Sequence, residues 1–218
     1  MKLAIFDLDN TLIAGDSDCL WGEFLSEHSY VDSETYQTGH KKFYQNYLEG
    51  NLDIKAFLEF QLKVLGENDR KDLEIWRSNY MEEKIKPILL GKAIELVDEH
   101  RQKGHELLII TATNRFLTEP ISEQFGVKNL IACEPEMVNG QYTGRYVGIP
   151  SYAEGKVARY KEWLSKQDDK LEESWFYSDS HNDIPLLREV DHAIAVDPDE
   201  SLQIEATKSG WKVISLRA

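Results

Sequence analysis

The sequence has few cysteines, few basic residues and no long apolar run, and each shortage excludes a class of protein. Only Cys19 and Cys133 occur among the 218 residues, and neither has a cysteine or histidine nearby at metal-ligand spacing. Two isolated cysteines are typical of a reducing compartment and argue against a disulfide-stabilised fold. We interpret both as small buried residues; a reactive thiol is the alternative.

Positive charge is also scarce, because 25 lysines and arginines against 39 acidic residues leave a net charge of −14. Nucleic acids and anionic membranes are bound by basic patches, so we expect neither as a partner. No stretch approaches the roughly 18 apolar residues of a membrane span. Asp7 and Asp9 interrupt the N-terminal apolar run too early for a signal peptide. We therefore expect a cytoplasmic protein.

What the sequence does contain is an alternation of short apolar runs and helical patterns. Most of the runs are continuous, as expected for strands buried on both faces of a parallel sheet. They cover residues 3–6, 107–110, 129–132, 175–177, 193–196 and 211–214. Helical periodicity covers residues 92–103, 116–125, 155–164 and 184–190. The alternation predicts an α/β fold built on a doubly wound, Rossmann-like parallel sheet.

Two segments interrupt this alternation. Residues 18–86 contain no convincing strand pattern but about four helical patterns rich in aromatic residues. They predict an all-helical cap domain at residues 15–87, inserted into a core formed by residues 1–14 and 88–218. Between residues 136 and 147, Asn139-Gly140 separates two short extended runs, which predicts a small β-hairpin.

Polar residues follow several predicted strands or begin a helix. They are Asp7, Asp9, Thr111, Lys156, Asp179 and Asp183, and Ala112 after Thr111 offers its backbone N–H. Because ligands of open α/β sheets bind beyond the carboxyl ends of the strands, we expect these residues to converge on one rim. Each residue alone is compatible with ordinary turn, cap or helix structure, whereas the ordered set indicates an active site.

The set is suited to phosphoryl transfer. Mg²⁺ prefers oxygen ligands, which Asp7 and Asp179 offer from neighbouring strands. A carboxylate also acts as a nucleophile and forms an aspartyl-phosphate, and Asp9 is placed to protonate the leaving oxygen and later to deprotonate water. The Thr111 hydroxyl, the backbone N–H groups after it and the charge of Lys156 would hold the phosphate.

These residues resemble the four motifs of the haloacid dehalogenase superfamily. The segment 7–12, Asp-Leu-Asp-Asn-Thr-Leu, is similar to its first motif, and residues 109–111, Ile-Ile-Thr, are similar to its second. Lys156 matches the third motif, and the segment 178–183 matches the fourth. The resemblance covers the whole chain, because the helical insertion is similar to the cap of that superfamily. It is greatest to the phosphoserine-phosphatase-like branch, which includes histidinol-phosphatases.

This resemblance implies a role for each matching residue. Asp7 would be the nucleophile and a metal ligand, and Asp9 would be the acid and base as well as a metal ligand through its carbonyl. Asp179 would be the other metal ligand, with Asp183 supporting it. Thr111, the Ala112 N–H and Lys156 would hold the phosphate. Ser178 departs from the glycine of many relatives, which leaves the backbone geometry of this loop open.

Two other functions share parts of the pattern. A signalling receiver domain takes phosphate on an aspartate after its third strand and has no helical insertion, whereas the third predicted strand here is followed by Cys133-Glu134. A phosphotransferase of the same superfamily stays open, but ion pumps carry threonine at the position of Asp9. We therefore predict a Mg²⁺-dependent phosphomonoesterase acting on a small phosphorylated metabolite.

The residues after the first motif indicate the charge of that metabolite. Asp16 and Asp18 stand at the expected entrance, with no lysine or arginine between Lys2 and Lys41. Acidic side chains attract an ammonium group and repel a carboxylate. The pattern favours L-histidinol phosphate over phosphoserine, with Trp21 as a candidate to stack on the cationic ring.

Three alternatives to this interpretation remain at the level of the sequence. In the first, Asp16 or Asp18 caps the helix that begins near Cys19. In the second, Arg70 or Arg77 reaches inward from the cap and allows the site to bind a substrate carboxylate. In the third, the aromatic residues of the cap, which we interpret as the cap's own core, form a cage for the substrate.

Overall fold

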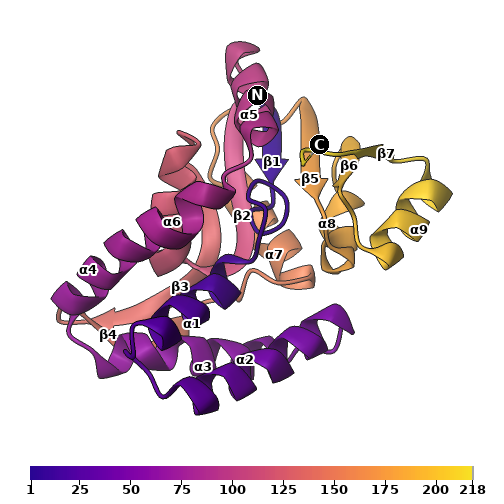
Figure 1. Cartoon of the computed structure of the whole chain (residues 1–218). Helices are drawn as coiled ribbons and strands as arrows, with labels where there is room; N and C mark the ends of the chain where they lie inside the picture. The colour runs from indigo at the N-terminus through magenta and orange to yellow at the C-terminus, as the bar shows by residue number, and fades with distance from the viewer. Residues whose placement is uncertain (218) are drawn as a thin grey trace.

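A seven-stranded sheet in the order β4-β3-β2-β1-β5-β6-β7 lies at the centre of the computed structural model (Figure 1). The structure describes residues 1–217, apart from the side chains of Ser33, Thr35, Gln37, His40 and Tyr44. Neighbouring strands pair in parallel except β3 and β4, which are antiparallel. The strands are β1 (Lys2–Phe6), β2 (Glu106–Asn114), β3 (Asn129–Val138), β4 (Gln141–Val147), β5 (Glu173–Ser178), β6 (His192–Val196) and β7 (Lys212–Ile214). The predicted doubly wound α/β fold is confirmed.

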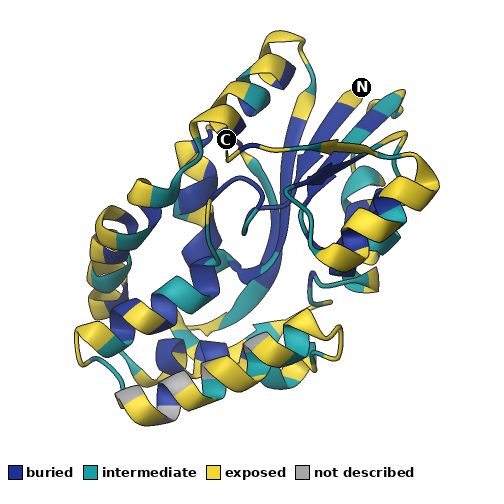
Figure 2. Cartoon of the chain, turned by 45° about the vertical axis from the view of Figure 1, so that its right-hand side comes forward, coloured by how far each residue is buried: buried dark blue, intermediate teal, exposed yellow. Residues whose placement is uncertain are grey.

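Helices cover both faces of the sheet, so the central strands are buried on both sides (Figure 2). One face carries α5 (Gly91–Gln102) and α6 (Arg115–Gln124), and the other carries α7 (Glu154–Leu164), α8 (Ile184–Leu187) and α9 (Glu200–Ser209). Successive residues of β1 alternate between the two sides: Phe6 packs with the first group and Ile5 with the second. The sequence did not predict α9, since it buries only Leu202 and Ala206.

A block of four helices follows β1. It consists of α1 (Ser17–Glu27), α2 (Ser33–Leu48), α3 (Ile54–Glu67) and α4 (Arg70–Tyr80). Asp16, Asp53 and Asp69 cap α1, α3 and α4 by accepting hydrogen bonds from N–H groups of the first turn. All four helices lie within the segment 15–87, which we retain as the proposed extent of the cap.

Among the described residues, no helix combines the length and the apolar character that crossing a bilayer requires.

The cap contacts the core where it is inserted and again at the β3–β4 hairpin. Where the chain leaves and re-enters the core, Ile13 forms an antiparallel bridge with Leu89, and the Ala14 N–H donates to the Ile88 carbonyl at 2.9 Å. At the far end, α3 packs on the β3–β4 hairpin so closely that a Cβ added to Gly66 would lie 2.6 Å from the Gly144 nitrogen. The cap therefore rests on the hairpin that the sequence predicted.

The hairpin turn has the conformation that its sequence requires. Asn139 and Gly140 both adopt positive φ, 51° and 80°. Two successive residues with positive φ are typical of the tight turn whose twist matches that of the flanking strands. The antiparallel pair Val138–Gln141 closes this turn.

Candidate active site

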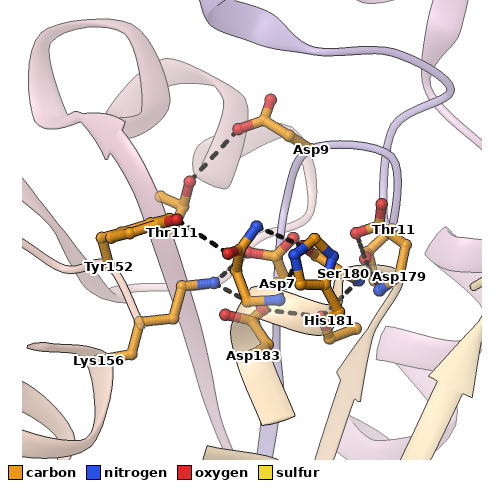
Figure 3. Close-up of polar contacts among 12 residues, drawn as sticks. Asp7, Asp9, Thr11, Thr111, Tyr152, Lys156, Asp179, Ser180, His181 and Asp183 are labelled. Atoms are coloured by element: carbon orange, nitrogen blue, oxygen red, sulfur yellow. Dashed lines mark hydrogen bonds and ion pairs between the residues drawn. The ribbon is translucent and has the colours of Figure 1, made fainter. Parts of the chain in front are cut away.

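The carboxyl ends of β1, β2 and β5 meet beneath the cap, and the polar residues predicted from the sequence gather there (Figure 3). All of them except Asp179 line a single cavity. The predicted residues in its wall are Asp7, Asp9, Asp16, Asp18, Thr111, Ala112, Lys156 and Asp183. Asp179 lies beside this wall, where its Oδ1 accepts a hydrogen bond from the Thr11 hydroxyl at 3.0 Å. The expected convergence on one rim is therefore found.

Lys156 lies between two carboxylates. Its Nζ is 2.7 Å from Asp7 Oδ1 and 2.7 Å from Asp183 Oδ2, and all three side chains are buried. Burial alone lowers the pKa of a lysine, but the attraction of Asp183 and Asp7 outweighs it and raises the pKa of Lys156. The amine therefore stays charged and neutralises part of the acidic cluster.

A tight turn before α7 brings Lys156 to this position. Ala153 adopts a positive φ of 47°, which is uncommon for a residue with a side chain. A Cβ added to Gly155 would overlap the Pro150 carbonyl oxygen. Only glycine therefore fits directly before the lysine.

The carboxylates around Lys156 are crowded and short of positive charge. Burial raises the pKa of Asp7 well above its usual range; Lys156 opposes this rise, and Asp183 and Asp179 add to it. Burial also raises the pKa of Asp179 to about 7, against the hydrogen bond from Thr11. Buried carboxylates that repel one another are suited to a hard divalent cation such as Mg²⁺.

No group of three or more histidine, cysteine, aspartate or glutamate side chains in the described part of the chain has the arrangement of a metal site. Mg²⁺ rarely needs such a group, because it is usually held by one or two carboxylates, with water and phosphate completing the shell. Asp7 and Asp179 offer that donor set.

The Asp9 carboxylate points toward the start of α1 and the end of β2. Its Oδ1 accepts from the Ser17 N–H at 2.7 Å, and its Oδ2 accepts from the Thr113 hydroxyl at 3.0 Å and from the Thr111 hydroxyl at 3.4 Å. Burial raises the pKa of Asp9, against these hydrogen bonds. A carboxyl group in this environment is able to hold a proton, as an acid catalyst must. Thr113 was not predicted, although a second threonine two residues after Thr111 was a visible signal.

Ser178, whose effect on loop geometry was left open, has a definite role here. Its hydroxyl donates to Asp183 Oδ2 at 2.7 Å and accepts from the Ser180 N–H at 3.2 Å. Ser178 is not among the described residues with positive φ, so its backbone does not require glycine. The serine thus orients Asp183 toward Lys156.

Apolar and aromatic side chains from the cap form the opposite wall of the cavity. They are Phe43, Tyr47, Leu52, Ile54 and Phe57, and Tyr152 of the core lies beside them. Phe43 and Phe57 contact each other edge to face, with ring centroids 5.5 Å apart. The interpretation of the cap aromatics as core alone was therefore incomplete.

Trp21 does not face the cavity, which corrects its suggested role in stacking on the substrate. Its ring is buried and packs against Phe24, Tyr80 and Phe116, because it lies on the side of α1 that meets α4 and α6. Helical spacing alone does not distinguish this position from those of Phe43 and Phe57.

The two cap arginines also point elsewhere. Arg77 donates to the Phe116 carbonyl and lies over the Phe116 ring, and Arg70 is paired with Glu74. Among the residues that the structure describes, no arginine lines the cavity.

Asp16 and Asp18 both line the cavity but differ in their bonding. Asp16 accepts from the Cys19 N–H at 2.8 Å, so it caps α1, and burial raises its pKa to about 6. Asp18 is buried, and its Oδ1 has no hydrogen-bond partner among the described residues. Burial raises the pKa of Asp18 well above its usual range, and repulsion by Asp16 and Asp9 raises it further. Helix capping therefore accounts for Asp16 but not for Asp18.

Comparison with known proteins identifies the family. The haloacid dehalogenase-like hydrolase family matches residues 4–188. A histidinol-phosphatase from Neisseria meningitidis serogroup C (strain 8013) is 41% identical over 220 residues, which cover 99% of this chain and 99% of the relative. A phosphoserine phosphatase from Mycobacterium tuberculosis is 29% identical and covers 98% of this chain and 70% of its own length.

A solved structure has the same fold. A protein of unknown function from Bordetella pertussis Tohama I superposes with a TM-score of 0.93 at 39% identity, covering 99% of this chain and 98% of its own. The shared fold, the convergent motif residues and the match over most of the sequence agree. The chain belongs to the haloacid dehalogenase-like hydrolase family.

Proposed function

We propose that this chain, a phosphatase of the haloacid dehalogenase-like family, is a Mg²⁺-dependent phosphomonoesterase that hydrolyses L-histidinol phosphate. One observation carries the choice of substrate: the cavity is lined by Asp18, whose Oδ1 has no hydrogen-bond partner among the described residues, and by no arginine among those residues. Such a lining favours a leaving alcohol that bears an ammonium group and no carboxylate.

Asp7 would carry out the first step of the reaction. One of its carboxylate oxygens attacks phosphorus, an aspartyl-phosphate forms, and the bond from phosphorus to the leaving alcohol oxygen breaks. Asp9 gives its proton to that oxygen, which its raised pKa permits. Asp9 then takes a proton from water as the water attacks phosphorus, releasing inorganic phosphate and restoring Asp7.

The remaining rim residues would bind and orient the phosphoryl group. Thr111, the Ala112 N–H and Lys156 all line the cavity on the same rim as Asp7. The carboxylates of Asp7 and Asp179 and the main-chain carbonyl of Asp9 would hold Mg²⁺, with Asp183 supporting them through Lys156. When bound, the cation supplies positive charge that lowers the repulsion between the anionic nucleophile and the phosphate.

The specificity for an amine follows from Asp18. A buried carboxylate with an unpartnered oxygen is costly unless a cation or a proton accompanies it. The ammonium group of L-histidinol phosphate would supply that cation, and Asp16 adds negative charge nearby. The rings of Phe43 and Phe57 offer the imidazole an apolar and quadrupolar surface.

Phosphoserine is the second candidate substrate, because a phosphoserine phosphatase is among the relatives. Its carboxylate would have to lie near Asp16 and Asp18, since Arg70 and Arg77 are engaged outside the cavity. The 41% identity to a histidinol-phosphatase over the full chain supports the first candidate.

The test is the ratio of kcat/KM for L-histidinol phosphate to that for O-phospho-L-serine, measured by release of inorganic phosphate. We expect a preference for L-histidinol phosphate of roughly 10-fold or more, as for the gain or loss of one charged hydrogen bond. A preference for phosphoserine would overturn the substrate assignment, as would undiminished histidinol-phosphate activity after combined Asp16→Ala and Asp18→Ala substitution. EDTA should abolish turnover and Mg²⁺ should restore it; persistent activity in EDTA would overturn the metal dependence.

A further inference from the structure

The cap touches the catalytic loop of the core through Tyr47 of α2. The Tyr47 hydroxyl donates to Ser180 Oγ at 3.0 Å, and Asn182 Nδ2 donates to the Tyr47 main-chain carbonyl at 3.4 Å. The first contact joins residues 133 positions apart and the second joins residues 135 positions apart. Both are therefore contacts between cap and core rather than local loop structure.

Ser180 belongs to a chain of hydrogen bonds that ends at the nucleophile candidate (Figure 3). Its N–H donates to Ser178 Oγ at 3.2 Å, and the Ser178 hydroxyl donates to Asp183 Oδ2 at 2.7 Å. Lys156 then joins Asp183 to Asp7 with two contacts of 2.7 Å. All five residues in this chain of hydrogen bonds are buried. Because a close-packed interior transmits displacements, a shift of Ser180 also moves the carboxylates of Asp183 and Asp7.

The same loop is held from the core side at the neighbouring residue. Asp199 Oδ2 accepts from the His181 N–H at 2.7 Å and lies 2.8 Å from His181 Nδ1. The cap approaches this histidine as well, because a Cβ added to Gly50, just beyond the end of α2, would lie 3.2 Å from His181 Nε2. The loop is thus fixed by the core at His181 and by the cap at Ser180 and Asn182.

We propose that Tyr47 and Ser180 form a latch that couples the seating of the cap to the positioning of the Asp179–Asp183 loop. Tyr47 is a positioning residue in this scheme: its ring lines the cavity, and its hydroxyl acts on the reacting groups through Ser180, Ser178 and Asp183. With the cap seated, the latch holds Asp183 against Lys156. When the cap moves away, the loop loses the hydrogen bond from Tyr47, and the carboxylates of Asp183 and Asp7 are held less firmly. The inference rests on the proposed function for the catalytic meaning of the loop, but the contact itself does not.

The experiment combines Tyr47→Phe, which removes only the hydroxyl, with Ser180→Ala in a double-mutant cycle. Tyr30→Phe is the matched control, because Tyr30 is a cap tyrosine that packs on Trp76 and does not line the cavity. We expect Tyr47→Phe to lower kcat for L-histidinol phosphate and for p-nitrophenyl phosphate about 3- to 10-fold, the loss of one neutral hydrogen bond. Ser180→Ala should lower kcat at least as much, because Ser180 Oγ also accepts from the Asn182 N–H and from Asn182 Nδ2. The double variant should lose no more than Ser180→Ala alone.

Amide hydrogen exchange gives a readout that does not depend on activity. In Tyr47→Phe, exchange should rise together in residues 45–51 and in residues 178–183, while β1 and the Tyr30→Phe control stay unchanged. Additive losses in the cycle, or faster exchange confined to α2, would overturn the latch. If the wild-type chain released no phosphate from any phosphomonoester, the proposed function would fail, and the exchange experiment would still decide the latch.

Discussion

The sheet rim and the cap contribute mostly different kinds of side chain to the same cavity. The sheet rim supplies Asp7, Lys156 and Asp183, joined by ion pairs of 2.7 Å. The cap supplies mainly rings and aliphatic groups, such as Phe43 and Phe57 in mutual contact, together with Asp16 and Asp18 at the start of α1. Charges fixed at strand ends are held in place by the whole sheet, whereas apolar helix faces tolerate replacement. We therefore propose that the rim performs the chemistry and that the cap selects the substrate.

The largest expected effect comes from Asp7→Asn at the rim. An amide is a poor nucleophile and a poor metal ligand, so turnover should fall to the background rate in a phosphate-release assay. Circular dichroism should show the wild-type fold, because asparagine keeps the size of the side chain. A variant with near-wild-type turnover would refute the assignment of the nucleophile.

The next largest effect should come from Asp9→Asn. The amide oxygen can still accept from the Ser17 N–H, and its NH2 group replaces Oδ2 beside the Thr113 hydroxyl, but acid and base function is lost. We expect kcat to fall roughly 10²- to 10⁴-fold, the usual cost of lost proton transfer. The Mg²⁺ concentration for half-maximal activity should change little, because the carbonyl of the main chain is unaltered. A purely structural role for Asp9 would instead appear as a lower melting temperature with kcat preserved in the folded fraction.

Asp18→Asn tests whether Asp18 selects the substrate or takes part in the chemistry. We expect kcat/KM for L-histidinol phosphate to fall roughly 10- to 100-fold, as for one charged hydrogen bond, and that for p-nitrophenyl phosphate to stay the same. Asp72→Asn is the matched control, because it removes an exposed acidic residue from the first turn of α4. Equal losses for both substrates would show that Asp18 serves the rim rather than the selection of an amine.

A smaller effect is expected from Phe43→Leu in the cap wall. Leucine keeps an apolar surface but has no ring face, so KM for L-histidinol phosphate should rise about 2- to 5-fold, the loss of one exposed cation–π contact. The value of kcat should stay within error, since the rim is untouched. A fall in kcat at constant KM would contradict the division of roles.

The smallest effect is the pH dependence of the stability of the metal-free protein. The pKa of Asp179 is raised to about 7 in the folded chain, so between about pH 4 and pH 7 the folded state binds more protons than the unfolded state. Stability without metal should therefore fall as pH rises through this window, shifting the melting temperature by a few degrees, about 2–4 °C per kcal/mol for a chain of this size. Mg²⁺ should stabilise most above pH 7. A melting temperature that rises with pH in EDTA would contradict this.

The fold and the rim were predictable because both depend on local pattern. The continuous apolar runs at residues 3–6 and 107–110 became β1 and β2, and Asn139-Gly140 became the predicted turn. The short helix α9 was not predicted, since few of its residues are buried. Thr113 was overlooked, although it donates to Asp9, because a hydroxyl near a motif is common in any sequence.

The sequence by itself determined the sheet, the presence of a helical block after β1 and the set of polar residues at the rim. The reason is that parallel strands bring their carboxyl ends together regardless of how the helices pack. Only the tertiary structure decided that Phe43 and Phe57 face the cavity while Trp21 faces the core, and that Arg77 turns to Phe116. All four lie in the helical insertion, and periodicity specifies that a helix has a buried side but not which partner covers it. The rotation and placement of each cap helix are set by contacts with distant segments, such as Gly66 against Gly144 and Tyr47 against Ser180.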